Sequence, residues 1–294
     1  MDQWFIYALA SALFSGLHAF TLKVAAERGI SSGFFNAYSC TFSACVGAVM
    51  AILCVPLSGH WLLGIAMAFL SGVIYVCSSS TRIESLRSIT TTLYFPISKS
   101  ATVIFTTVAG ILLFFESITF SEWIALGLAL LVPLMLLHPG EVKQQKQIHR
   151  GVLFLILASL FSALATVVNK YSTGIFDSPL VFVVVTHISI ACVGWASGML
   201  EERKRAADNV AQRERALTTS FVVLCVCAGT FQLLGFWTNM VSLTEGPLSL
   251  AYAVMSFQML VPMLLSALVY KEQWDLRKGA AVALSCASMY FMVQ

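Results

Sequence analysis

The chain has 294 residues, of which 59% are hydrophobic and only 11% are charged, and its formal net charge is +3. Soluble domains carry about 45–50% apolar and roughly 25% charged residues, so this composition excludes an ordinary water-soluble protein. We therefore expect an integral membrane protein.

Ten apolar runs follow one another along the chain, each close to the roughly 20 residues that cross a bilayer as a helix. The sequence thus predicts an all-α membrane protein with ten transmembrane helices. The predicted helices cover residues 4–24, 33–56, 61–84, 91–115, 121–138, 151–171, 179–200, 218–241, 247–270 and 278–293. The connections are short except at 139–150, a polar linker, and at 201–217, a charged stretch compatible with a solvated helix.

The linker at 139–150 divides the chain into two halves of five helices, residues 1–138 and 151–294, and the halves match each other. The matched pairs are Leu13-Phe14-Ser15 with Leu160-Phe161-Ser162 and Lys23 with Lys170 at an offset of 147, Glu116 with Glu272 at 156, and Ser85-Leu86 with Ser242-Leu243 at 157. Because five is odd, the second half enters the membrane from the opposite side. We therefore predict two inverted five-helix repeats, an arrangement that suits alternating access.

The orientation follows from the basic residues, because cytoplasmic loops carry an excess of Lys and Arg. Fifteen of the 17 Lys and Arg residues lie after odd-numbered helices, including Arg82. Lys170 is alone on the other face, and Lys99 lies inside a helix. We expect the odd-numbered loops in the cytoplasm, both termini outside, and a multi-pass protein of the cytoplasmic (inner) membrane.

Enzyme and metal chemistry find little support in the sequence. It contains no HExxH, GxSxG or P-loop motif and no cluster of metal ligands, so we predict no catalytic residue, metal or cofactor. The eight cysteines fall in apolar runs without a CxxC pair and are interpreted as small hydrophobes. The expected partners are the lipid bilayer and a small-molecule substrate, with no nucleic acid.

Lys99 is the sharpest candidate for a binding residue. It lies inside the fourth predicted helix, where a lysine costs roughly 2.5–3.5 kcal/mol on insertion scales. Helical spacing places Thr92, Thr102 and Thr106 on its face. This stripe predicts a cavity wall whose cation meets an anionic substrate group. The alternative is that Lys99 extends to the cytoplasmic headgroups.

Further polar residues lie inside other predicted helices. His18 and His187 are compatible with hydrogen bonding between helices or with a role in the site. Gly229, Gln232, Gly235 and Asn239 share one face of the eighth helix, and the repeat offset pairs Gln232 with Tyr75 and Asn239 with Arg82 in the third. Paired polar stripes favour a central cavity over polar contacts that only join helices.

The remaining candidates are Gln258, near the position that matches Lys99, and the GxxxG pair Gly194 and Gly198, which indicates close helix packing.

The ten helices in two repeats, the lysine that closes the first helix of each repeat and the glutamate that closes the fourth resemble the drug/metabolite transporter superfamily, EamA-like branch. The family's first-helix signature commonly has Trp-Gly-x-Asn and then Lys. Here Ser15-Gly16-Leu17-His18 and then Lys23 keep the Gly and Lys, and the second copy keeps only Lys170. The resemblance implies transport of a small solute and leaves the substrate open.

The predicted function is secondary transport of a small polar, anionic or zwitterionic metabolite across the cytoplasmic membrane. The proposed substrate-binding residues are Lys99, Thr102, Thr106, His18, Tyr75, Gln232, Asn239 and Gln258. A positive site without a carboxylate at mid-depth disfavours a lipophilic cation as substrate. The alternatives are a flippase for a lipid-linked substrate and a membrane partner subunit without transport activity.

Overall fold

The computed structural model describes residues 3–28, 30, 32–54, 61–86, 91–135, 148–175, 178–207, 219–269 and 276–293. The described chain is helical and contains no strand. Its elements are α1 (Gln3–Glu27), α2 (Ser32–Cys54), α3 (Trp61–Leu86), α4 (Thr91–Phe114), α5 (Phe120–Met135), α6 (Ile148–Ser172), α7 (Pro179–Ala207), α8 (Thr219–Glu245), α9 (Leu248–Ser256), the 3-10 turn η2 (Phe257–Met259), α10 (Leu260–Val269) and α11 (Leu276–Val293).

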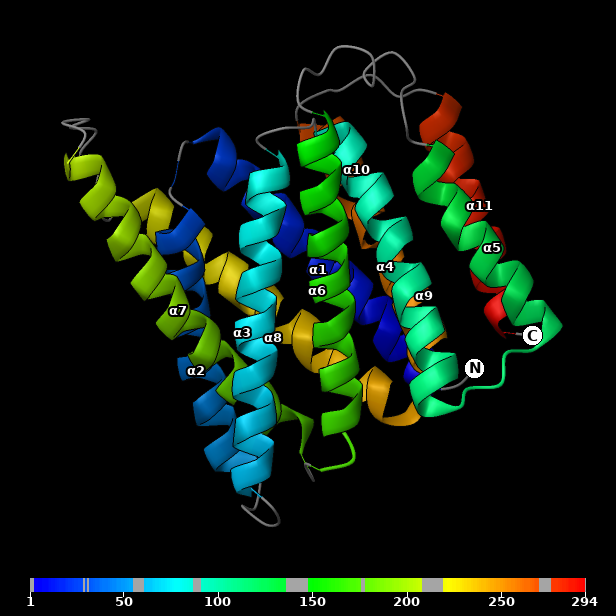
Figure 1. Ribbon diagram of the computed structural model, residues 1–294, viewed down its shortest axis with the longest axis horizontal. Coiled ribbons are helices and arrows are strands. Elements are labelled where there is room, and N and C mark those ends of the chain that lie inside the picture. The colour runs from blue at the N-terminus through cyan, green and yellow to red at the C-terminus, as the bar shows by residue number, and fades with distance from the viewer. Residues whose placement is uncertain are drawn as a thin grey trace.

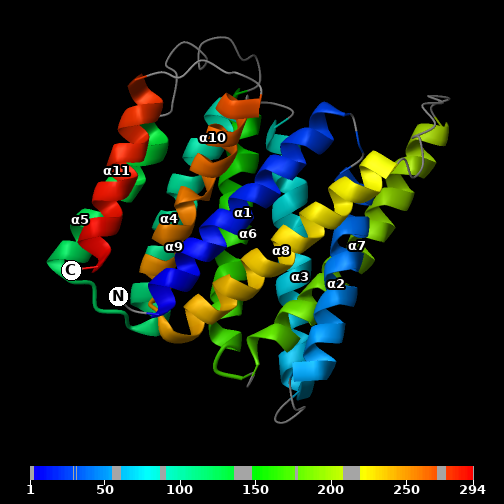
Figure 2. The ribbon, with the colours of Figure 1, turned by 180° about the vertical axis from the view of Figure 1, so that it is seen from behind.

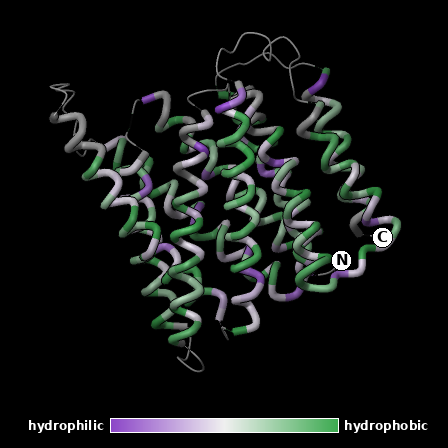
Figure 3. The backbone as a smooth tube through the Cα atoms, in the orientation of Figure 1, coloured by the Kyte–Doolittle hydropathy of each residue, from purple (hydrophilic) through white to green (hydrophobic). Residues whose placement is uncertain are grey.

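The helices have the composition of membrane spans, which confirms a multi-pass integral membrane protein. Within the described residues, six helices are long and apolar enough to cross a bilayer, and four shorter apolar helices accompany them. Each of the ten predicted spans coincides with a helix to within a few residues, except that the ninth consists of α9, η2 and α10. Most of the linker at 139–150 and residues 208–218 of the charged stretch lie outside the described residues. Figure 3 shows hydrophobic residues along most of each helix.

The helices pair across the two halves of the chain. α1 packs along α8, α6 packs along α3, α2 packs on α7, and α5 packs on α11. Figures 1 and 2 show α5 and α11 together at one side of the bundle and α2 and α7 at the other. The N and C labels lie at the same end, as an even number of crossings requires.

Small residues bring α2 close to α7 and α8. The predicted GxxxG pair does pack helices: a Cβ at Gly194 would lie 3.2 Å from the backbone nitrogen of Ala37, and one at Gly198 would lie 3.2 Å from the Phe34 ring. On the other side of α2, Ser43 Oγ donates a 2.7 Å hydrogen bond to the carbonyl of Gly229. Lipid supplies no hydrophobic drive between helices, so close backbone approach and such hydrogen bonds hold them together.

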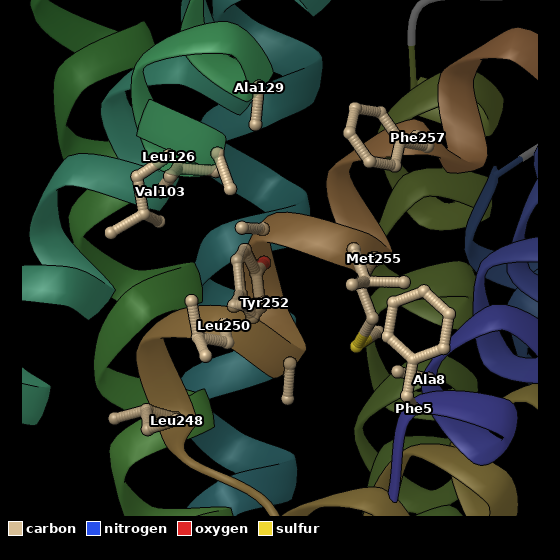
Figure 4. Packing of buried hydrophobic residues seen from close by; sticks show 14 of the residues in the cluster. Phe5, Ala8, Val103, Leu126, Ala129, Leu248, Leu250, Tyr252, Met255 and Phe257 are labelled. Carbon is tan, nitrogen blue, oxygen red and sulfur yellow. The ribbon is translucent and has the colours of Figure 1, made fainter. Parts of the chain in front are cut away.

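The largest apolar cluster surrounds α9. Figure 4 shows Leu248, Leu250 and Met255 of α9 among side chains of α1, α4 and α5, with Tyr252 in their midst. Every residue of α9 is buried. α9 is therefore enclosed by protein along its whole length.

The ninth span is interrupted where it meets α1. The 3-10 turn at Phe257–Met259 separates α9 from α10. A Cβ at Gly16 would lie 2.6 Å from the carbonyl oxygen of Gln258 and 2.5 Å from Cβ of Val261. Only glycine lets α1 approach the interruption this closely.

Glu116 and Lys170 hold the two ends of the turn between α8 and α9. Glu116 accepts hydrogen bonds from the backbone N–H of Leu248, from the N–H of Ser249 at 3.1 Å and from its hydroxyl at 2.6 Å. Lys170 Nζ donates to the carbonyls of Leu243 at 2.6 Å and Gly246 at 2.7 Å. A carboxylate at a helix N-terminus and an ammonium at a C-terminus both complement the helix dipole. Glu116 therefore does more than end a helix at the membrane interface. The residues that match this pair in the other half, Lys23 and Glu272, cannot be compared, because the Lys23 side chain and Glu272 lie outside the described residues.

The close contact at Gly229 can be tested with Gly229→Ala. The added Cβ would lie 2.6 Å from the Ser39 carbonyl and 2.9 Å from the Phe42 ring, so α2 and α8 must separate. Overpacking of this kind costs about 1–3 kcal/mol, and we expect a lower midpoint of thermal unfolding in detergent. Gly127→Ala is the control, because nothing lies within 4 Å of its Cβ position. Equal midpoints for the two variants would contradict the packing described.

The cap on α9 can be tested with Glu116→Gln. The amide keeps one acceptor oxygen but places an NH₂ group where the second oxygen accepts from Ser249. We expect a loss of about 1–3 kcal/mol in stability, because a donor at the start of a buried helix loses its partner. Glu245→Gln removes the same charge from an exposed side chain beside the turn and should leave the unfolding midpoint unchanged.

Candidate functional site

Side-chain hydrogen bonds fix α3, α4 and α9 around α6. Ser78 Oγ of α3 donates to the carbonyl of Ala158 at 2.9 Å. At the next residue of α6, Ser159 Oγ lies 3.0 Å from Ser98 Oγ of α4. One turn further, Ser162 Oγ lies 3.3 Å from the Tyr252 hydroxyl of α9. The three helices therefore contact α6 within about one turn, between Ala158 and Ser162, and the candidate site is built from side chains of these helices.

Lys99 follows Ser98 directly and is partly buried inside the bundle. Within the described part of the chain, its ammonium has no hydrogen-bond or ion-pair partner, and the charged group that acts on it is Arg82. An ammonium without a partner inside a membrane helix is costly. Lys99 is thus available to an incoming ligand.

Arg82 lies within α3, one turn after Ser78, and so shares the face of α3 that contacts α6. Its side chain hydrogen-bonds to Tyr94, whereas its buried Nε has no partner among the described residues. The sequence analysis counted Arg82 with the basic residues of the cytoplasmic loops. That assignment was wrong, because the guanidinium is inside the helix bundle and not in a loop.

Three tyrosines lie near Arg82. Tyr75, Tyr94 and Tyr252 all lie within electrostatic range of Arg82. Tyr94 is 1% exposed, and Tyr252 lies in the apolar cluster around α9 with its hydroxyl near Ser162. The phenol hydroxyls are hydrogen-bond donors at neutral pH, as a site for an anion requires.

The two histidines lie beside this cluster. His18 of α1 is within electrostatic range of both His187 of α7 and Arg82. His187 is fully buried, and its Nδ1 lies 2.7 Å from the carbonyl of Val183, so Nδ1 carries the hydrogen and Nε2 is an acceptor. The Nε2 atoms of both rings are buried without a partner in the described structure. The structure thus connects His187 with the cluster as well as the predicted His18.

The predicted amides lie at different places. Gln232 of α8 accepts a hydrogen bond from the Cys40 thiol at 3.4 Å, and Cys40 in turn interacts with Tyr75. Asn239 is 5% exposed, and its Oδ1 lacks a partner among the described residues. Gln258 lies in η2, where its backbone carbonyl packs against Gly16. Gln232 is therefore connected with the cluster through Cys40 and Tyr75, and Gln258 lies at the interruption of the ninth span.

The predicted hydroxyls on α4 are buried, but their hydrogens are used. Thr102 Oγ1 donates to the carbonyl of Ser98 at 2.7 Å, and Thr106 Oγ1 donates to that of Thr102 at 2.9 Å. Each hydroxyl therefore offers only acceptor lone pairs to a ligand in this conformation. The side chain of Thr92 lies outside the described residues.

The structure brings Lys99, His18 and Tyr75 together and adds residues that the sequence analysis did not propose. The added residues are Arg82, Tyr94, Tyr252, His187 and Cys40. The spacing of seven residues between Tyr75 and Arg82 was a usable signal, because it puts both on one helix face. Tyr94 and Tyr252 come from other helices and left no such signal.

The cluster has the chemistry of an anion site. It offers one ammonium, one guanidinium and phenol hydroxyls, and no carboxylate is paired with either cation in the described structure. The described residues contain no group of three or more potential metal ligands. The cysteines that the structure describes are free thiols, of which Cys40 and Cys225 are buried in the bundle.

Comparison with known proteins adds the family and the fold. Residues 149–294 match the EamA-like transporter family. A solved structure, a crystal structure of a protein, aligns with 99% of this chain and 98% of its own at a TM-score of 0.80 and 12% sequence identity. No curated protein matches the chain. The structural likeness covers both halves of the chain, which shows that the solved structure shares this fold.

Lys99 and Lys170 should respond in opposite ways to replacement by methionine. Lys99→Met removes a partly buried charge that has no described partner, so the unfolding midpoint in detergent should stay or rise. Lys170→Met leaves the carbonyls of Leu243 and Gly246 without their donor. Hydrogen bonds to charged groups contribute about 1.5–3 kcal/mol each, so this midpoint should fall. A fall of similar size in Lys99→Met would indicate a structural role for Lys99.

Proposed function

We propose that this chain, a multi-pass membrane protein whose residues 149–294 are an EamA-like transporter domain, moves a small anionic or zwitterionic metabolite across the cytoplasmic membrane. The observation that carries the proposal is Lys99, an ammonium inside an apolar bundle with no described partner and with Arg82 as its charged neighbour. Such a residue inside a membrane protein marks a pathway or a binding site more often than a structural contact.

The transport mechanism we propose is alternating access between two inverted five-helix repeats, residues 1–138 and 151–294. The helix pairs support it, because exchanging the halves turns the pair of α1 and α8 into that of α6 and α3. The same exchange maps α2 with α7 and α5 with α11 onto themselves. Each half can then take the conformation that the other has left.

Two hydrogen bonds support the repeat at the level of single residues. Ser11 Oγ donates to the carbonyl of Gly235 at 2.8 Å, and Ser78 Oγ donates to that of Ala158 at 2.9 Å. The sequence offsets of 147 and 157 match Ser11 with Ala158 and Ser78 with Gly235. The two bonds thus join equivalent positions, once between α1 and α8 and once between α6 and α3.

The substrate site in this proposal lies where the two halves meet. Lys99, Tyr75 and His18 come from the first half, and Gln232 and Asn239 come from the second. Thr102, Thr106 and Gln258 remain proposed site residues, with Thr102 and Thr106 as hydrogen-bond acceptors. The odd-numbered loops face the cytoplasm and both termini lie outside, because the basic residues gather after odd-numbered helices.

Transport of a labelled metabolite library by the purified protein in liposomes tests the function. We expect flux of at least one small polar solute. Lys99→Met should abolish that flux while the protein stays folded, and Lys99→Arg should recover little if the ammonium acts as a compact point charge. Thr102→Val should weaken transport less, because a neutral hydrogen bond contributes about 0.5–1.5 kcal/mol.

Other outcomes identify the alternatives. Near wild-type flux in both Lys99→Arg and Lys99→Met would exclude Lys99 from the site and favour its extension to the headgroups. Scrambling of labelled lipid without solute flux would identify a flippase. A stable complex with another membrane protein, without any flux, would identify a partner subunit.

A further inference from the structure

Arg82 and Lys99 form a pair of like charges inside the bundle. Arg82 follows Ser78 by one turn on α3, and Lys99 follows Ser98 on α4. Ser78 and Ser98 contact consecutive residues of α6, the carbonyl of Ala158 at 2.9 Å and the hydroxyl of Ser159 at 3.0 Å. These hydrogen bonds place α3 and α4 on neighbouring positions of α6, and a hydrogen bond from Arg82 to Tyr94 brings the guanidinium to α4, the helix that carries Lys99.

Nothing in the described structure neutralises this pair. The groups that act on Arg82 are the phenols of Tyr94, Tyr75 and Tyr252, and the group that acts on Lys99 is Arg82 itself. Two like charges within electrostatic range of each other in a poorly solvated interior repel each other. The bundle tolerates them at a cost that a ligand of opposite charge removes.

The number of negative charges on a ligand decides how well it matches the two cations. A single carboxylate would leave one of the two cations without a counter-charge. A zwitterion would add a third cation, and the described cluster has no carboxylate to receive it. A group with two negative charges satisfies both cations, and the hydroxyls of Tyr75, Tyr94 and Tyr252 can donate to its remaining oxygens.

We infer that Arg82 and Lys99 together bind a small dianion, either a phosphate monoester or a dicarboxylate, and that Arg82 sets this charge selectivity. The inference rests on the proposed function and narrows its substrate from anionic or zwitterionic to doubly charged. Arg82 binds the ligand directly through its guanidinium, whose Nε is buried without a described partner. Guanidinium groups suit such ligands because they donate two parallel hydrogen bonds to a phosphate or a carboxylate.

The binding test measures the unfolding midpoint of the whole chain in detergent at about pH 7, where a phosphate monoester already carries close to two negative charges. The added probes, at low millimolar concentration, are glycerol 3-phosphate, succinate, lactate and alanine. We expect a saturable rise with glycerol 3-phosphate or with succinate that exceeds the rise with lactate and alanine. Which of the two dianions acts distinguishes a phosphate from a dicarboxylate ligand.

Substitutions of Lys99 and Arg82 show what each of the two cations contributes to binding. Lys99→Met and Arg82→Gln should each weaken the binding of the dianion by about ten- to a hundredfold, since each removes a charged hydrogen-bond partner. Arg82→Gln should also reduce the preference for the dianion over lactate, because one cation remains. Arg82→Lys keeps the charge and should retain this preference even if Arg82→Gln fails to fold. Arg28→Gln, which removes an exposed charge far from α3 and α4 in sequence, is the control and should bind as the wild type does.

Transport by the same proteins separates this inference from the function on which it rests. If lactate or alanine is bound as well as the dianions are, or if Arg82→Gln binds like the wild type, the assignment of a dianion is wrong. Flux of a monoanion or a zwitterion that requires Lys99 would then leave the transport function standing. If neither dianion binds and no solute moves, both the dianion assignment and the transport function are wrong.

Discussion

The lipid solvent is the constraint on which the rest of this structure depends. In a bilayer every backbone N–H and C=O must find its partner within the protein, so the chain forms helices wherever it crosses. The same requirement governs the places where a helix stops inside the fold. At the turn between α8 and α9, side chains from elsewhere supply the missing partners: Glu116 for the N–H groups of α9 and Lys170 for the carbonyls of α8.

A second consequence is that helices in lipid must be joined by something other than hydrophobic contact. Here serine hydroxyls and glycines serve that purpose. Ser11, Ser43 and Ser78 each donate to a carbonyl of a neighbouring helix, where glycine or alanine lets the backbones approach. Two of these contacts join α1 and α2 to α8, and the third joins α3, which carries Arg82, to α6.

The sequence predicted the crossings well and the site only in part, for physical reasons. Membrane helices are visible because hydropathy over about 20 residues is a local property. Lys99 was visible because a charge within such a run is rare. Arg82 was misassigned because a basic residue near the end of a helix satisfies the rule for cytoplasmic loops equally well. Tyr94 and Tyr252 are ordinary residues in an apolar sequence, and only the packing of α4 against α6 and α9 brings them to Arg82.

The turn between α8 and α9 also bears on which piece of the chain can exist by itself. The family match begins at residue 149, yet the carboxylate that caps α9 belongs to Glu116, which precedes it. The neighbours of α6 and α8 in the bundle, α3 and α1, are also supplied by the first half. A fragment that contains only residues 149–294 would keep Lys170 at one end of the turn and leave the other end open. The unit that sequence comparison recognises is therefore smaller than the unit that holds these helices in place, because the contacts of residues 149–294 extend into the first half of the chain.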